Sequence, residues 1–248
     1  MKQYRTDLHV HIGRSSQNEP VKVTGARDLT FENVARRAVT SAGLEIVGIV
    51  DCASPRVIRD VRRLLDCGHM TELDGGGLAY SVPDGAAVTV IPGAELEAEL
   101  PGGCSAHYLC YLPTMEAMGE FSVEVGRHMT NVDLSTQRVR TAPRDLASLA
   151  RGLGGLFVPA HVFTPHKGVL GGCVPRLADA MGPGGMDLVD GIELGLSADT
   201  PMADTIAELA RYTFLSNSDA HSLPRLGREF NVIVAEEPSF AELAMALR

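Results

Sequence analysis

The chain has 248 residues, of which 45% are hydrophobic and 21% are charged, and its formal net charge is −9. These values are ordinary for one globular α/β domain, so we expect a single domain over residues 1–248. The negative charge opposes long-range attraction to phosphate backbones and disfavours a general nucleic-acid-binding protein.

The cysteines and the amino-terminus indicate a compartment. Five cysteines are an odd number, and the sequence contains no Cys-x-x-Cys pair, so we expect neither a disulfide framework nor a zinc ribbon. The polar amino-terminus lacks the apolar core of a signal peptide, and no run of about 18 apolar residues predicts a membrane span. We therefore predict a soluble cytoplasmic protein with reduced thiols.

Apolar periodicity predicts strands and helices that alternate along most of the chain. In the first half we expect strands at 4–11, 45–50, 88–91 and 105–112, helices at 34–42, 55–65 and 114–129, and a mobile loop without a core at 68–87. In the second half we expect helices at 143–151, 202–211 and 239–247, and strands at 154–160, 189–194, 213–218 and 231–235. This order predicts a largely parallel α/β sheet, either open or closed into a barrel.

Polar side chains follow many of these strands. Asp51, Glu95, His161 and Asp219 come at the carboxyl ends of separate strands, and a barrel brings such ends to one mouth. Side chains two apart on an extended chain share a face, as in His-x-His and Asp-x-His. The full set of candidate metal ligands is His9, His11, Asp51, Glu95, His107, His161, Asp219 and His221.

Imidazole and carboxylate ligands without thiolates suit zinc, manganese or iron(II). Eight candidates exceed the three or four protein ligands that one metal with an open position takes, so the sequence predicts two or three metals, bridged by Glu95 or Asp219. Such a cluster lowers the pKa of a bound water and binds a phosphoryl oxygen.

These motifs resemble those of a known family. His9-x-His11, the segment PGAE ending at Glu95, PAH ending at His161 and Asp219-x-His221 are similar, in this order, to the metal motifs of the PHP (polymerase and histidinol phosphatase) superfamily. Three stretches, PAHVFTPHKG, GIELGLSAD and SNSDAHSLPRLGREFN, resemble the branch that includes endonuclease Q, which cuts DNA beside deaminated bases.

The resemblance implies a distorted (β/α)7, TIM-like barrel and phosphoester hydrolysis. By motif, one metal would be held by His9, His11, Glu95 and Asp219, and a second by Glu95, His107 and His161. A third would use His221 and the strand end at Asp51, although Cys52 stands where many members have a histidine. Asp219, Glu95 and His221 are the predicted catalytic residues.

Several basic side chains are candidates for binding the substrate phosphate. These are Arg225, Arg228, His166 and Lys167. The alternatives without a role in substrate binding are a salt bridge from either arginine to Glu229 or Glu236, and a solvated loop around His166. A further basic segment, Arg127 to Arg151, is either a phosphate track or solvated helix surface.

We therefore predict a metal-dependent phosphoesterase that hydrolyses a phosphomonoester or phosphodiester through a metal-activated water. The first alternative is an endonuclease on deaminated or damaged DNA, although endonuclease Q continues into a zinc-binding and helical carboxyl-terminal region. The second is a metal-binding regulatory or scaffold module without turnover. The oligomeric state is left open by the sequence.

Overall fold

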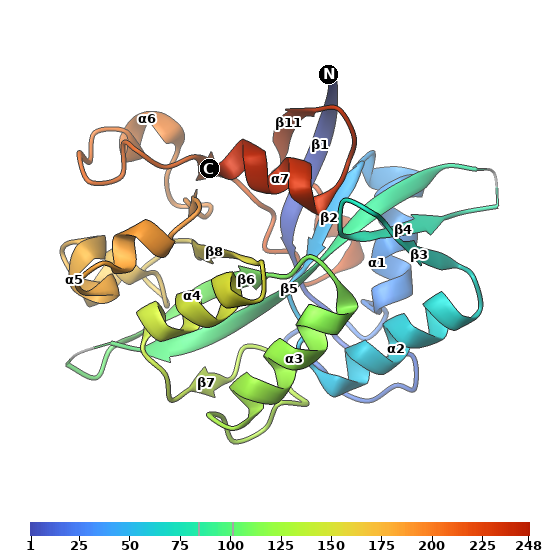
Figure 1. Ribbon diagram of the computed structural model, residues 1–248, viewed down its shortest axis with the longest axis horizontal. Coiled ribbons are helices and arrows are strands. Elements are labelled where there is room, and N and C mark those ends of the chain that lie inside the picture. Colours follow the sequence, from blue (N-terminus) through green and yellow to red (C-terminus); the bar gives the residue numbers. More distant parts are fainter. Residues whose placement is uncertain (84, 101) are drawn as a thin grey trace.

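A nine-stranded mixed sheet forms the centre of the structure (Figure 1). The computed structural model describes residues 1–83, 85–100 and 102–248. The strands are β1 (Lys2–Val10), β2 (Ile46–Ile49), β3 (Met70–Glu72), β4 (Leu78–Ser81), β5 (Ala87–Glu99), β6 (Ser105–Tyr111), β7 (Arg138–Val139), β8 (Leu156–Pro159), β9 (Ile192–Glu193), β10 (Phe214–Leu215) and β11 (Asn231–Ala235).

The predicted parallel arrangement is found at the centre of the sheet, where β1 pairs with β2 and β2 with β5. Antiparallel strands extend this core: β11 along β1, β4 and β6 along β5, and β8 along β6. Strands β9 and β10 form a separate parallel pair, so the regular ladders of the described residues do not close into a barrel.

A few backbone hydrogen bonds join the separate pair and its flanking residues to the large sheet on both sides. On one side Val162 N donates to Glu193 O (2.9 Å), next to β8. On the other side His11 N donates to Ala220 O (3.1 Å), which links the end of β1 to the segment after β10. The carboxyl ends of β1, β8, β9 and β10 therefore lie close together.

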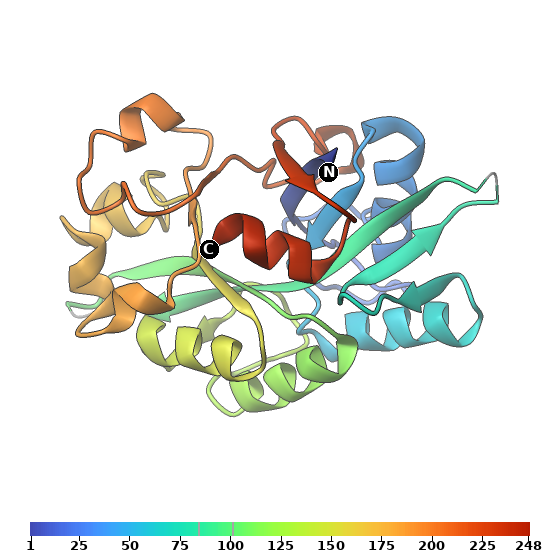
Figure 2. The ribbon, with the colours of Figure 1, turned by 45° about the horizontal axis from the view of Figure 1, so that its top comes forward.

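Helices cover both faces of the sheet. They are α1 (Phe31–Arg37), α2 (Pro55–Asp66), α3 (Met115–Gly126), α4 (Pro143–Gly152), α5 (Leu177–Met181), α6 (Thr200–Ala203) and α7 (Phe240–Leu247), with short π or 3₁₀ turns η1 (Ala38–Ala42), η2 (Val169–Cys173), η3 (Gly185–Leu188) and η4 (Leu223–Arg225). Figure 2 shows α2, α3 and α4 along one side of the sheet and α7 on the other.

Two apolar clusters hold these layers together. The larger lies between the sheet and helices α1 to α5 and includes Phe31, Leu64 and Phe121. The smaller lies on the opposite face, where Leu243 and Leu247 of α7 pack with side chains of the central strands. Burial of a large apolar side chain contributes about 1.5–3 kcal/mol, so both faces contribute to stability and the polar strand ends lie outside these clusters.

Two predicted segments differ from the structure. The stretch 68–87, apart from residue 84, which lies outside the described residues, is not a loop without a core, because β3 and β4 form a hairpin that pairs with β5 and buries Leu78. The predicted helix 202–211 is much shorter, since α6 is confined to Thr200–Ala203. In the hairpin, pairing with a neighbouring strand overrides the local preference of a Gly-rich sequence.

The expectation that all cysteines are reduced is wrong. Cys104 and Cys173 form a disulfide with their Cα atoms 5.5 Å apart, across a sequence separation of 69 residues. Packing brings the β5–β6 turn against η2, so the pairing is not visible in local spacing. Cys52, Cys67 and Cys110 are free. Within the described residues, none of the helices has the length and apolar character required for a membrane span.

Candidate metal centre

A first group of ligands gathers at the carboxyl end of β1. His9 is the penultimate residue of β1 and His11 follows its end, so both imidazoles project to one face and are fully buried. Their Nε2 atoms are 3.3 Å apart. Asp219 Oδ1, from the loop after β10, lies 3.6 Å from His9 Nε2 and 3.3 Å from His11 Nε2. These three side chains are close enough to hold one cation.

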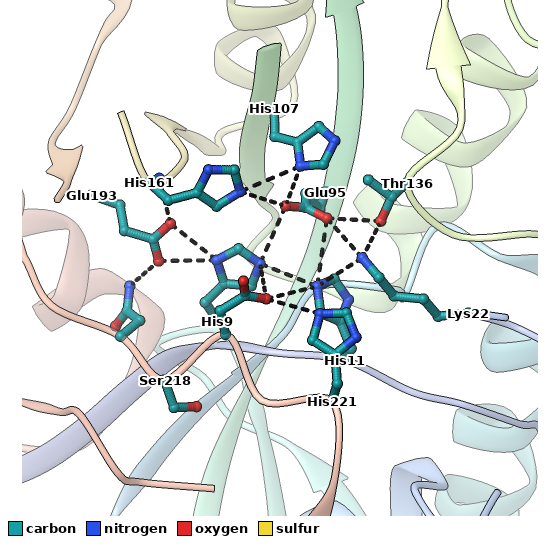
Figure 3. A network of polar contacts seen from close by, with 12 residues as sticks. His9, His11, Lys22, Glu95, His107, Thr136, His161, Glu193, Ser218 and His221 are labelled. Carbon is teal, nitrogen blue, oxygen red and sulfur yellow. Dashed lines mark hydrogen bonds and ion pairs between the residues drawn. The ribbon is translucent and has the colours of Figure 1, made fainter. Parts of the chain in front are cut away.

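A second group is centred on Glu95 of β5. Glu95 Oε1 lies 2.9 Å from His107 Nδ1 on β6 and 3.3 Å from His161 Nε2 after β8. The same carboxylate reaches the first group, with Oε1 3.4 Å from His9 and Oε2 3.5 Å from His11. Figure 3 shows Glu95 between the two groups. Its two oxygens are therefore placed to bridge a pair of cations.

Buried carboxylates stand behind the first two histidines. Glu193 Oε1 lies 2.9 Å from His9 Nδ1, and Asp51 Oδ1 lies 3.0 Å from His11 Nδ1. Each carboxylate orients its ring and directs Nε2 toward the centre, as supporting groups around metal-ligating histidines do. Asp51 also accepts from Ser135 and thus lies outside both groups among the described residues, although the sequence favoured it as a ligand.

Glu193 was not assigned a role from the sequence. Its position at the end of β9 was the available signal, because the other strand ends carry ligands. Beyond His9, it accepts a hydrogen bond from His161 N (2.8 Å) and from Asn217 Nδ2 (2.8 Å). One buried carboxylate therefore ties together β1, the end of β8 and the segment after β10.

Backbone conformation at the centre is unusual. Among the described residues with positive φ that are not glycine, Thr136 (51°), His161 (29°), Lys167 (61°) and Asp219 (45°) lie in or beside the site. Such conformations cost about 1–3 kcal/mol each and persist where the surroundings enforce them. Three of these residues, Thr136, His161 and Asp219, have side chains that contact the two groups, so backbone strain accompanies the aiming of these side chains.

Two further contacts hold the strained segments. The buried carboxylate of Asp7 accepts from Ser218 N (3.1 Å) and Gly227 N (3.0 Å), which anchors the loop that carries Asp219. Gly195 has φ of +75°, and a Cβ there would lie 2.7 Å from His161 Cβ. A glycine is required at this position because any side chain would push the loop away from His161.

The charges of the centre stabilise one another. Burial would lower the pKa of His9, but the charges of Glu193 and Asp219 outweigh it and raise this pKa well above its ordinary value. Burial would raise the pKa of Glu95, but the charges of His107 and Lys22 outweigh it and hold this pKa well below its usual range. The centre therefore keeps its carboxylates ionised and attracts positive charge.

Lys22, from the loop between β1 and α1, is a second residue without a predicted role. Its Nζ lies 3.0 Å from His11 Nε2, 3.1 Å from Glu95 Oε2 and 2.7 Å from Thr136 Oγ1. Figure 3 shows Lys22 and Thr136 on the side of Glu95 away from His161. A polar loop gives no periodic signal, so only the tertiary structure reveals this contact.

The predicted third metal position has few free ligands. His221 Nε2 lies 3.2 Å from Asp219 Oδ1, and its Nδ1 lies 3.3 Å from Thr24 Oγ1. Cys52 is fully buried, donates to Ile49 O (3.1 Å), and has a pKa raised by burial. Of the described residues, His221 joins neither group of three.

A cavity of about 430 Å³ opens over the centre. Asp219 of the first group and all three residues of the second group line it, together with Lys22, Thr24 and the loop residues Thr164, His166, Leu196 and Ser197. His9 and His11 are fully buried beneath this lining. Of the residues predicted to bind phosphate, His166 lines it, whereas Lys167 Nζ is bound to Glu97 (3.0 Å) and Arg228 Nε donates to Ser218 O (2.9 Å). Arg225 is exposed on η4.

The donor set fits divalent cations. Each group offers imidazole nitrogens and a carboxylate oxygen, all within 4.8 Å of one another. In the first group the Nδ1 atoms of His9 and His11 are bound by carboxylates, so the lone pairs of their Nε2 atoms remain to face a cation. Nitrogen and oxygen donors of this kind suit zinc, manganese or iron(II).

Glu97, two residues beyond Glu95, provides a test of local stability. Partial burial would raise its pKa, but hydrogen bonds from Ser105, Lys167 and Arg138 outweigh it and lower the pKa to about 2. A carboxyl with a lowered folded pKa stabilises the fold above its unfolded pKa, and this stabilisation is lost as pH falls through the folded value.

We expect Glu97→Gln to have a lower free energy of unfolding than the wild type at neutral pH. The difference should shrink as pH falls from the ordinary value of 4.5 toward about 2, because the wild-type carboxylate is protonated over this window. Urea denaturation at several pH values measures the difference, with exposed Glu99 on the same strand substituted as a control. A difference that does not change with pH would contradict the assignment.

Known proteins share sequence and fold with this chain. No protein-family model matches the chain. It is 40% identical over 251 residues to the uncharacterised protein YqxK of Bacillus subtilis, covering 100% of the chain and 62% of that protein.

Among solved structures, the chain is similar to the lesion-specific endonuclease PfuEndoQ of Pyrococcus furiosus, with a TM-score of 0.81 and 31% identity over 99% of the chain and 56% of that protein. A complex of endonuclease Q with a 27-mer duplex that has an abasic lesion at the active site matches with a TM-score of 0.79, 31% identity and the same coverage. The predicted resemblance to endonuclease Q is confirmed.

A two-domain protein of Bacteroides vulgatus that contains a predicted PHP-like metal-dependent phosphoesterase shares the fold, with a TM-score of 0.58 and 14% identity over 99% of the chain and 62% of that protein. The endonuclease Q-like chain therefore also has the fold of PHP-like phosphoesterases. The chain described by this sequence spans about three fifths of the length of YqxK and of PfuEndoQ.

Proposed function

We propose that this protein is a metal-dependent phosphoesterase that hydrolyses a phosphomonoester or a phosphodiester. The observation that carries the proposal is the position of Glu95, which lines the cavity and lies between two histidine groups. Two divalent ions held there would supply a Lewis acid for the phosphoryl oxygen and an activated water. Zinc, manganese and iron(II) all fit the donors.

Some residues of the centre would ligate the metal ions, and others would orient these ligands. His9, His11 and Asp219 would hold one ion, and His107 and His161 the other, with Glu95 shared. Asp51 and Glu193 would orient the histidines rather than ligate. Asp219 is 38% exposed and faces the cavity, so it is the carboxylate best placed to contact a reacting water.

We infer further that residues 1–248 form one distorted seven-stranded barrel from β1, β2, β5, β6, β8, β9 and β10. The inference is supported by the hydrogen bonds that join β9 and β10 to β8 on one side and to the end of β1 on the other. Such an arrangement would bring candidate ligands on or just after five separate strands to one mouth.

The likeness to endonuclease Q favours a second candidate, cleavage of DNA beside a lesion. The basic segment between Arg127 and Arg151 adds little to it, because Arg127 pairs with Glu124, Arg138 with Glu97 and Arg151 with Asp190. Arginines already paired with carboxylates have less charge to offer a phosphate backbone.

A substrate panel separates the candidates. The manganese-loaded protein is expected to release p-nitrophenol from p-nitrophenyl phosphate or its diester, and EDTA is expected to abolish the release. Nicking of duplexes with uracil, hypoxanthine or an abasic site, without release from small esters, would instead establish the endonuclease. Bound metal without hydrolysis of any substrate would contradict both and indicate a regulatory module.

A further inference from the structure

We propose that Lys22 is a built-in cation that competes with a divalent metal for the first histidine group and, once displaced, binds the substrate phosphate in the cavity. The inference rests on the proposed phosphoesterase function. It assigns two successive positions to one side chain, each with its own measurable consequence.

The competition follows from a shared lone pair. His11 has its Nδ1 bound by Asp51 at 3.0 Å, so Nε2 is the nitrogen that can ligate, and Lys22 Nζ lies 3.0 Å from this atom. Lys22 Nζ also donates to Glu95 Oε2 at 3.1 Å, and this oxygen is the one that faces His11. One lone pair cannot serve an ammonium and a metal ion together, so a metal that binds His11 must move the ammonium away.

The backbone around Lys22 stays in place while the side chain moves. Lys22 N donates to Ile12 O (3.0 Å), Gly25 N donates to Lys22 O (3.0 Å), and Val21 is fully buried. The four-carbon stem of lysine is flexible and its ammonium has three donors, so the charged end can change partners without unfolding the loop.

The cavity offers the displaced ammonium its second position. Lys22 lines the cavity together with Thr24 and His221, and its side chain is 12% exposed. Of the described residues that line this cavity, only Lys22 is a lysine or an arginine. Thr136 Oγ1, 2.7 Å from Nζ, is a neutral partner of the ammonium. A phosphate oxygen bound beside Glu95 would therefore meet Lys22.

The two positions predict opposite effects of one substitution. Removing the charge in Lys22→Met should raise zinc affinity roughly tenfold, or about 1.4 kcal/mol, because the metal no longer displaces an ammonium. It should lower the affinity of the zinc-loaded protein for inorganic phosphate by roughly tenfold, because a cation at the mouth is lost. A purely structural lysine would weaken both affinities or neither.

The test uses the full chain and two probes, zinc alone and inorganic phosphate. Zinc affinity is measured by competition with a chromophoric chelator, and phosphate affinity of the zinc-loaded protein by calorimetry. Lys22→Gln is measured beside Lys22→Met, so that one misfolded variant does not decide the result. Lys167→Met is the charge-matched control for zinc, because Lys167 binds Glu97 and Ser105 and contacts no member of the first group in the structure.

Tighter zinc binding with weaker phosphate binding in a Lys22 variant supports the proposal. Unchanged or weaker zinc binding in both folded Lys22 variants overturns it, as does an equal gain in Lys167→Met. A wild-type chain that binds no zinc, manganese or iron(II) overturns the proposed function itself, which distinguishes the two failures.

Discussion

Glu95→Gln is expected to lose at least about 1,000-fold in phosphoester hydrolysis, or about 4 kcal/mol of transition-state stabilisation, and to bind fewer than two metal ions per chain. Glu95 Oε1 contacts His107, His161 and His9, while Oε2 contacts His11 and Lys22. An amide removes the charge that both positions share. It also turns two N–H donors toward the histidines.

The measurement combines metal content per chain by elemental analysis with hydrolysis of the active substrate. Glu99→Gln is the matched control for metal content, because it makes the same change at an exposed position four residues along the same strand and outside both groups. A Glu95→Gln protein with wild-type metal content and rate would show that Glu95 does not bridge.

His9→Ala is expected to bind one metal ion fewer than the wild type and to lose at least about 1,000-fold in hydrolysis. The same change leaves the buried carboxylate of Glu193 without its imidazole partner, 2.9 Å away in the wild type. Breaking one side of a buried pair costs about 3–5 kcal/mol, so the metal-free variant should also unfold at a lower temperature.

Glu193→Gln distinguishes the effect of losing a metal ligand from the effect of losing a residue that orients a ligand. It keeps the His9 ring but removes the carboxylate behind it, and loss of such a partner lowers metal affinity by about 10- to 100-fold without removing a ligand. His128→Ala, at a half-buried position after α3 where the ring lies beside Glu124, controls for loss of an imidazole elsewhere. If both His9→Ala and Asp219→Asn keep wild-type metal content and activity, the proposed centre is wrong.

The local sequence pattern predicts the His-x-His part of the candidate metal centre. His9 and His11 share a face because an extended backbone repeats every two residues. The same repeat does not hold for Asp219 and His221, because Asp219 lies beyond β10 with φ of 45°. The parallel centre of the sheet and the place of His161 just after β8 were also predictable, since buried strands read as short apolar runs. The predicted strand end before Glu95 was wrong, because β5 continues to Glu99 by pairing with β6. The correctly predicted features need no knowledge of distant contacts.

The other features depend on which distant segments pack together. Asp51 reads as a ligand from its place after β2, yet packing against Ser135 puts it behind His11. The Cys104–Cys173 disulfide joins segments 69 residues apart. No local period encodes such pairings.

Lys22 shows the same limit most clearly. It lies in a polar loop between the first strand and the first helix, where the sequence has no repeating pattern to interpret. Only the folded chain places its ammonium between His11, Glu95 and Thr136, residues up to 114 positions away. The sequence by itself therefore determined which side chains are candidate ligands, because their residue types and spacing are local features. The tertiary structure decided that the ammonium of Lys22 and the carboxylates of Asp51 and Glu193 surround them, because these contacts join distant segments.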